Sequence, residues 1–249
     1  MTNASCAHVT NHGDAPFFIF CDHATNAIPP EFHGLGLPDD ILQTHIAYDI
    51  GAGALTDGLA DRLSGVCLLS TFSRLLADPN RDCDRPDFIP AVSDQIPIPG
   101  NARLSPERRQ ERMDRFYGPY HERLAEALDT SQGAHTNPFV VSVHSFSPRL
   151  MGEMDDRPWH VGLLWREDEK SARALMAWLG DNTDYCVGDN QPYDARIYNY
   201  TVDRHVGPRG LAHLTLEVRQ DLLSKSNEID KMADNLARAI EAIAADPAR

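Results

Sequence analysis

The stretch PFFIFCDHATNAIP, residues 16–29, runs through four apolar residues and Cys21 and then stops at Asp22 and His23. A short apolar run bounded by proline and polar residues is typical of a strand buried on both faces of a parallel sheet. Asp22 and His23 are costly to bury without partners, so the end of this strand needs neighbours that satisfy them. The stretch therefore predicts a buried strand that ends at a polar site.

Strands and helices are expected to alternate along the rest of the chain. Similar apolar runs predict strands over residues 65–72, 138–146, 159–165 and 211–223. Helical spacing of apolar residues predicts helices over residues 45–63, 105–130, 168–181 and 227–246. This order predicts an α/β fold with a mostly parallel sheet between helices. We expect one domain over residues 16–249, after a loose lead-in over residues 1–15.

Composition and charge exclude several classes of partner. The formal net charge of -14 would repel a phosphate backbone, so we expect no nucleic-acid partner. No apolar run approaches the roughly 20 residues that cross a bilayer, so we expect no membrane partner. The start of the chain lacks the pattern of a secretory signal, and five scattered cysteines without a CxxC pair predict free thiols. These features together predict a cytoplasmic protein.

Three of the predicted strands end at or near a chemically useful side chain: His23, His144 and Glu217. Sites in open α/β sheets lie beyond the carboxyl ends of the strands, so these side chains are expected to converge. Two imidazoles and one oxygen ligand leave an open position on zinc, and a separate carboxylate can then transfer a proton. Taken singly, each histidine could instead bond to backbone, and Glu217 could pair with Arg219 or Arg204.

The segment between residues 73 and 101 is too long to be a simple connection. Its DPNR motif places Asn80 beside Arg81, an amide and a forked guanidinium that can hold a carboxylate or polarise a carbonyl. The alternative is a type I turn over residues 78–80 with Arg81 in a surface ion pair. A turn-rich segment ahead of the last strand supplies three tyrosines that could form a lid or simply pack: Tyr193, Tyr198 and Tyr200.

Several motifs, in this order, resemble the N-formylglutamate amidohydrolase family from about residue 16 to the C-terminal helix. They are CDHATNAIPPEFHGLGLP, HIAYDIGAGA, FSRLLADPNRD, IPGN, VSVHSFSP, RPWHVGLLW, VGDNQPY and HLTLEVRQDLL. That family belongs to the zinc carboxypeptidase-like superfamily, with aspartoacylase and succinylglutamate desuccinylase. The resemblance implies a three-layer α/β/α fold with a mixed sheet. It also implies zinc-dependent hydrolysis of a small-molecule N-acyl acidic amino acid such as N-formyl-L-glutamate.

Matched residue by residue, the resemblance implies that His23 and His144 bind zinc and that Glu217 is the general base. Relatives with an HxxE motif carry a glutamate three residues after the first histidine, where this chain has Asn26. We expect Asp49, early in the predicted helix 45–63, to be the third ligand, because a carboxylate neutralises a dication better than an amide does. Asn26 is the alternative ligand.

The resemblance also implies substrate-binding residues. Asn80 and Arg81 match the pair that positions the substrate carboxylate and carbonyl, and Arg81 is expected to stabilise the oxyanion with the metal. Arg74 is a candidate second anion anchor, and Tyr200 is a candidate contact from the lid segment. Two other functions stay open: a hydrolase of the same superfamily with a peptide-like or cell-wall-derived substrate, and a binding module without metal.

Overall fold

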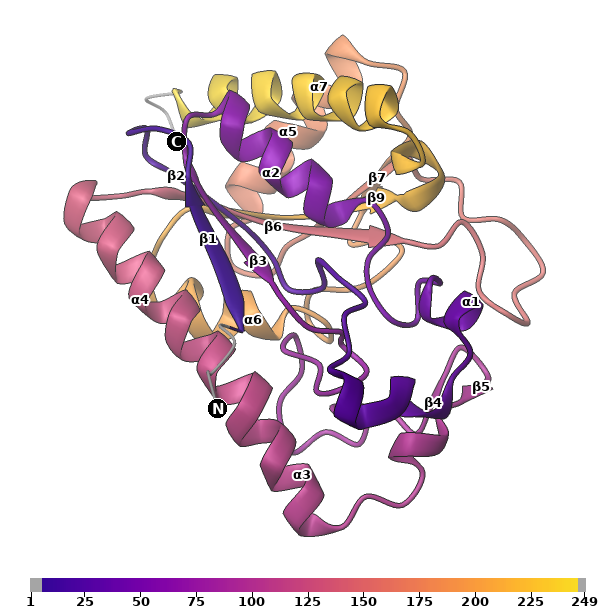
Figure 1. Cartoon of the computed structure of the whole chain (residues 1–249). Coiled ribbons are helices and arrows are strands. Elements are labelled where there is room, and N and C mark those ends of the chain that lie inside the picture. Colours follow the sequence, from indigo (N-terminus) through magenta and orange to yellow (C-terminus); the bar gives the residue numbers. More distant parts are fainter. Residues whose placement is uncertain (1–5, 246–249) are drawn as a thin grey trace.

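A seven-stranded mixed sheet forms the centre of the computed structural model, which describes residues 6–245 (Figure 1). The strand order is β1-β3-β2-β6-β9-β7-β8. The strands are β1 (Ala7–Asn11), β2 (Phe17–Cys21), β3 (Val66–Ser70), β6 (Phe139–Phe146), β7 (Val161–Leu164), β8 (Val187–Asp189) and β9 (His213–Arg219). Strands β3, β2, β6 and β9 pair in parallel, whereas β1 and β7 run antiparallel to β3 and β9. The predicted mostly parallel, mixed sheet is confirmed.

Strand β2 is buried along its whole length because it lies between β3 and β6 with helices over both faces. Successive side chains of a strand point to opposite faces, so this strand contributes to two cores. Phe17 and Ile19 belong to one apolar core, and Phe18 and Phe20 belong to the other. The continuous apolar run that opens the sequence therefore reflects burial on both sides.

Helices cover the two faces of the sheet. Helices α2 (Ala52–Arg62), α5 (Glu169–Asn182) and α7 (Ser226–Ala244) cover one face. Helix α4 (Gly118–Ala134) and the short helix α6 (Tyr200–His205) lie on the other side of the sheet in Figure 1. The three-layer arrangement expected from the sequence is present.

The predicted helix over residues 45–63 is shorter than expected, because α2 begins only at Ala52. Gly51 precedes it with a left-handed φ of 78°, so the chain turns sharply there instead of continuing a helix. Asp49 consequently lies in the turn before the helix, where its backbone N–H donates to His23 O at 2.9 Å. The prediction that Asp49 lies early in a helix is wrong.

Other differences involve short elements. The predicted helix 105–130 consists of α3 (Pro106–Arg112), a π-helical turn (Met113–Tyr117) and α4. Residues 7–11 form β1 at the sheet edge, where a loose lead-in was expected, and residues 1–5 of that lead-in lie outside the described part. Other short elements include helix α1 (Asp39–Leu42) and the hairpin of β4 (Val92–Ser93) and β5 (Ile96–Pro97). Elements of two to five residues are too short to show a periodic pattern.

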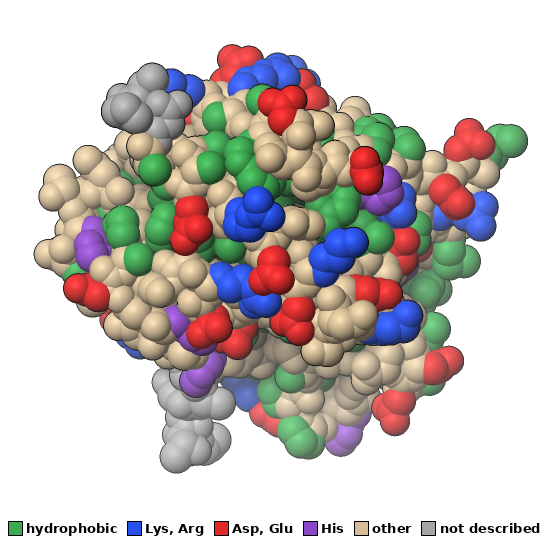
Figure 2. Space-filling view, turned by 90° about the horizontal axis from the view of Figure 1, so that it is seen from above, with side chains coloured by type: hydrophobic (Ala, Val, Ile, Leu, Met, Phe, Trp, Pro, Cys, Tyr) green, Lys and Arg blue, Asp and Glu red, His purple; other side chains and the backbone are tan. Residues whose placement is uncertain are grey.

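The outer face formed by α2, α5 and α7 carries acidic and basic side chains that are interspersed rather than separated by sign (Figure 2). Arg62 of α2, for example, pairs with Asp230 and Asp234 of α7. Within residues 6–245 no helix is long and apolar enough to cross a membrane. All five cysteines lie in the described range as thiols outside any disulfide.

The turn at Gly51 generates a prediction about stability. A Cβ atom at this position would lie 2.4 Å from Leu223 Cβ and 2.9 Å from Leu223 O. We expect Gly51→Ala to lower the free energy of unfolding by at least about 2 kcal/mol, through positive-φ strain and overpacking. Urea unfolding measures this loss.

Gly180→Ala in α5 is the matched control, because a Cβ there meets nothing within 4 Å. Its expected effect is a gain of about 0.5–1 kcal/mol from helix propensity. Equal unfolding midpoints for Gly51→Ala and the wild type would contradict the argument.

Candidate active site

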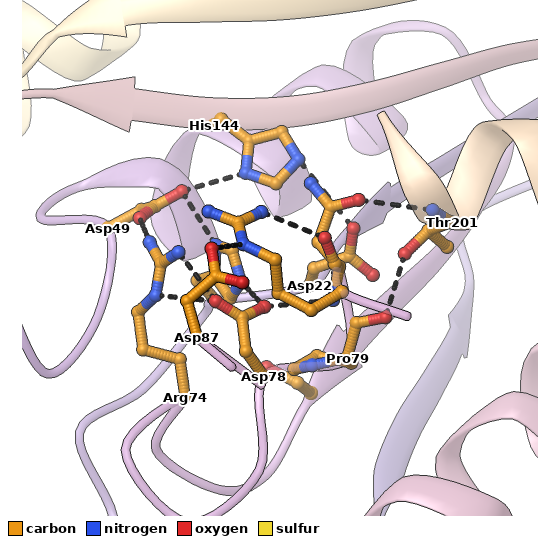
Figure 3. A network of polar contacts seen from close by, with 12 residues as sticks. Asp22, Asp49, Arg74, Asp78, Pro79, Asp87, His144 and Thr201 are labelled. Carbon is orange, nitrogen blue, oxygen red and sulfur yellow. Dashed lines mark hydrogen bonds and ion pairs between the residues drawn. The ribbon is translucent and has the colours of Figure 1, made fainter. Parts of the chain in front are cut away.

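Three side chains that could hold a metal ion meet at the carboxyl end of the central strands. His23 follows β2, His144 lies in β6, and Asp49 comes from the turn before α2; all three are buried. Asp49 Oδ2 lies 3.2 Å from His23 Nδ1 and 2.8 Å from His144 Nδ1 (Figure 3). One potential ligand atom from each residue lies within 4.8 Å of the others. The structure thus brings together the three residues that the sequence analysis selected.

A carboxylate lies behind each of the two imidazoles. His23 Nε2 is 2.8 Å from Asp78 Oδ1, and His144 Nε2 is 3.6 Å from Asp22 Oδ2. For His23, the Asp78 carboxylate can hold a proton on Nε2, which would leave the Nδ1 lone pair for a metal ion. His144 Nε2 lies closer to the Ser142 hydroxyl, at 3.2 Å, than to Asp22. Both Nδ1 atoms lie at hydrogen-bond distance from Asp49 Oδ2, and an imidazole protonated at Nδ1 donates to that carboxylate. Asp78 was not among the residues predicted from the sequence, although it lies in the same DPNR motif as Asn80 and Arg81.

One oxygen of Asp22 is bound by a residue of α4, whereas within the described residues Oδ2 has no hydrogen-bond partner. The hydroxyl of Tyr120 in α4 donates to Asp22 Oδ1 at 2.6 Å. Burial raises the pKa of Asp22, although His144 and His23 oppose this effect. The polar residues after β2 therefore have partners from other elements. Asp22 contacts Tyr120 and His144, and His23 contacts Asp78.

Arg74 is bound by two carboxylates of the cluster. It donates to Asp78 Oδ2 from Nη2 and Nε, at 2.6 and 3.0 Å, and to Asp49 Oδ1 from Nη1 at 3.2 Å. Burial favours the neutral acid, yet Arg74 and His23 hold the pKa of Asp78 well below its usual range. Arg74, which was expected to bind an anion of the substrate, is therefore bound to two carboxylates of the protein itself.

The electrostatics of the cluster show an attraction between opposite charges. Despite burial, His23 and His144 lower the pKa of Asp49. Burial would lower the pKa of His144, but Asp49 raises it to about 9. In this structure the positive charge opposite the Asp49 carboxylate is therefore that of a protonated imidazole.

Glu217 lies beside His144, because the two residues are partners in the β6–β9 register. It is buried, and within the described residues its Oε2 has no hydrogen-bond partner. Burial is the main cause that raises the pKa of Glu217 to about 7. A carboxyl with an unpaired oxygen at the cavity wall is well placed to accept and return a proton.

A cavity of about 330 Å³ opens above these groups. Its lining includes Arg81, Asp87 and Tyr198 on the long loop and the lid segment, and also Tyr193 and His45. Arg81 donates from Nε to Asp87 at 3.0 Å, so its ion pair lies at the cavity and not on the outer surface.

Asn80 has a structural contact that the sequence analysis did not foresee. Its Oδ1 accepts a hydrogen bond from the backbone N–H of Thr201 at 3.0 Å, and the Thr201 hydroxyl donates to Pro79 O (Figure 3). The backbone N–H of Arg81 donates to Asp78 O at 3.2 Å, so the turn weighed as an alternative is present. The amide of Asn80 thus ties this turn to the start of α6.

Two other candidates point away from the cavity. Asn26 Nδ2 donates to Leu42 O at 2.8 Å and does not approach the histidines. Tyr200 accepts hydrogen bonds from Tyr117 and Arg204 at 2.8 and 3.1 Å and is not part of the cavity lining. Tyr193 and Tyr198 of the same segment do line the cavity. Tertiary packing decides which of the three tyrosines reach it.

Comparisons with known proteins identify the family of the chain and structures with a similar fold. The chain matches the N-formylglutamate amidohydrolase family over residues 15–224. It is similar to the crystal structure of a gene product from Agrobacterium tumefaciens, with a TM-score of 0.92, 30% sequence identity and coverage of 97% of this chain and 96% of that chain. A search of curated proteins finds no significant match.

A second solved structure shares the fold. It is an N-formylglutamate amidohydrolase from Ralstonia eutropha, with a TM-score of 0.75, 18% identity and coverage of 97% of this chain and 98% of that chain. The resemblance noted in the sequence is confirmed by the family match, which covers most of the chain. The chain belongs to the N-formylglutamate amidohydrolase family and is an amide-hydrolysing enzyme.

Proposed function

We propose that this enzyme is a zinc-dependent amidohydrolase of N-acylated acidic amino acids, with N-formyl-L-glutamate as the first substrate to test. The observation that carries the proposal is the convergence of His23 Nδ1 and His144 Nδ1 on Asp49 Oδ2. Membership of the family supports amide hydrolysis and a small-molecule amino-acid substrate.

The residues of the cluster fit a zinc ion. Two imidazoles and one carboxylate are a donor set of catalytic zinc sites, which keep a fourth position open. Asp49 Oδ1 is engaged by Arg74, which leaves Oδ2 for the ion. In the buried cluster, protons on the imidazoles offset the negative charge of Asp49. A bound dication would replace these protons. Imidazole ligands favour zinc over magnesium or calcium.

Glu217 is the proposed general base and acid. Its Oε2 would take a proton from the attacking water and return it to the amine nitrogen as the C–N bond breaks, releasing the acyl acid and the amino acid. A bound zinc ion would supply a Lewis acid for the carbonyl and lower the pKa of water.

Arg81 would bind the substrate carboxylate and stabilise the developing negative charge on the carbonyl oxygen. Asn80 would hold Arg81 in place through the turn, and Arg74 would keep Asp49 and Asp78 ionised. Tyr198 is a better supported substrate contact than Tyr200, because only Tyr198 lines the cavity.

Metal content tests the first part of the proposal. Protein purified without chelator should contain about one zinc per chain, and the His23→Ala, His144→Ala double variant should lose it. Elemental analysis measures both, with His135→Ala at the end of α4 as the control. Absence of metal from the wild type, even after zinc is added, would refute the metal site.

Asp78 gives a sharper test because it does not touch the ion itself. Asp78→Asn should weaken zinc affinity about 10- to 100-fold, since the imidazole of His23 loses its orienting carboxylate. Competition with a chelator of known affinity measures the change. Asp57→Asn is the matched control, because Asp57 also pairs with a histidine, at 3.0 Å, but on the surface. Equal affinities in both variants would contradict the role of Asp78.

Glu217→Gln tests the catalytic step. We expect kcat for N-formyl-L-glutamate to fall about 10²- to 10⁴-fold, while zinc content stays at the wild-type level. Formate release measures turnover, and Glu241→Gln on α7 is the control. A zinc-loaded Glu217→Gln protein with the wild-type rate would disprove this assignment. Assaying peptides and other N-acyl amino acids beside N-formyl-L-glutamate separates the proposed substrate from a peptide-like one.

A further inference from the structure

The long loop places a second guanidinium beside the cavity. Arg81 and Arg85 both bind the single carboxylate of Asp87: Arg81 Nε lies 3.0 Å from Oδ2, and Arg85 Nε lies 2.8 Å from Oδ1. A further bond joins Arg85 Nη2 to Asp87 Oδ2 at 3.0 Å. Two positive groups share one negative group, so the trio retains a positive charge. Asp87 accepts from Nε and Nη2 of Arg85, so Nη1 of Arg85 is left to bind another anion.

Tyr198 holds the two guanidiniums in place. The centre of its ring lies 4.9 Å from Arg81 Cζ and 5.7 Å from Arg85 Cζ, which is the range of cation–π contacts. Tyr198 and Asp87 both line the cavity, and the Arg85 side chain is 37% exposed. Arg85 is therefore oriented by two cavity residues while its guanidinium stays accessible.

Elsewhere in the cavity, carboxylates offset the other groups that could attract an anion. Arg74 binds Asp49 and Asp78. Burial lowers the pKa of His45, whose Nε2 lies 3.0 Å from Asp94 Oδ2. An anion entering the cavity is consequently attracted to Arg81 in the wall and to its neighbour Arg85 rather than to the region of His45.

We propose that Arg85, stacked on Tyr198, binds the side-chain carboxylate of the substrate and selects N-acyl glutamate over N-acyl glutamine. The inference rests on the proposed function, in which Arg81 binds the other carboxylate. Two arginines that share Asp87 can each accept one carboxylate of a dicarboxylic amino acid. Arg85 is thus a specificity-determining residue.

Kinetics of Arg85→Gln with two substrates test the inference. We expect KM for N-formyl-L-glutamate to rise about 10- to 100-fold and KM for N-formyl-L-glutamine to change much less, because only N-formyl-L-glutamate carries the side-chain carboxylate. Arg85→Lys should give an intermediate KM, because it keeps the charge and loses the planar fork. Arg123→Gln on α4 is the control, an exposed arginine paired with Glu126. An equal change for both substrates, or no change for either, would overturn the inference.

Calorimetry separates this inference from the proposed function. Neither L-glutamate nor L-glutamine carries an N-acyl group. The two differ only in the side chain, which ends in a carboxylate in glutamate and in an amide in glutamine. The wild type should bind L-glutamate more tightly, and Arg85→Gln should remove the preference. If that preference is found but neither N-formyl compound is hydrolysed, the carboxylate site stands and the proposed function fails. If the wild type binds both amino acids equally, the carboxylate site is refuted.

Discussion

The carboxylate of Asp78 links the cluster of His23, Asp49 and His144 to the loop that lines the cavity. One oxygen contacts His23 Nε2 and also accepts the backbone N–H of Asn80 at 2.9 Å, and the other oxygen binds Arg74. The orientation of the imidazole and the path of the loop therefore depend on the same buried charge. Removing one partner from such a network leaves an unpaired buried charge, which typically costs about 3–5 kcal/mol.

The distribution of charge bears on how an acidic chain would bind the acidic substrate proposed above. The formal net charge is -14, and on the α2–α5–α7 face side chains of both signs are interspersed (Figure 2). Inside the cavity each arginine is held by aspartates, so the local balance differs from wall to wall. Net charge thus affects long-range attraction of partners such as nucleic acid. Recognition of a small anion depends instead on a few charged groups at the binding site.

The parallel arrangement of β2, β6 and β9 is what brings the catalytic candidates together. Their carboxyl ends meet at one edge of the sheet, and the β6–β9 register sets His144 directly beside Glu217. The turn at Gly51 then returns the chain so that Asp49 reaches both imidazoles. A rigid sheet edge and one sharp turn hold the site, while loops supply the substrate walls.

The sequence by itself determined the buried β2, the order of strands and helices, and the strand-end side chains His23, His144 and Glu217. These features are local, because burial on both faces and helical spacing are written in consecutive residues. The DPNR motif made Arg81 a candidate, and Asp49 was preferred to Asn26 as the third ligand because a carboxylate neutralises a dication better than an amide does.

Only the tertiary structure decided that Asp49 rather than Asn26 faces the histidines, that Asp78 orients His23, and that Tyr198 rather than Tyr200 reaches the cavity. It also revealed the antiparallel pairing of β1 and β7 with their neighbours and the late start of α2. The partners of these contacts are far apart in the chain: His144 and Asp49 are separated by 95 residues, and His23 and Asp78 by 55. Such pairings depend on how loops pack after the sheet has formed, and no local pattern in the sequence encodes that packing.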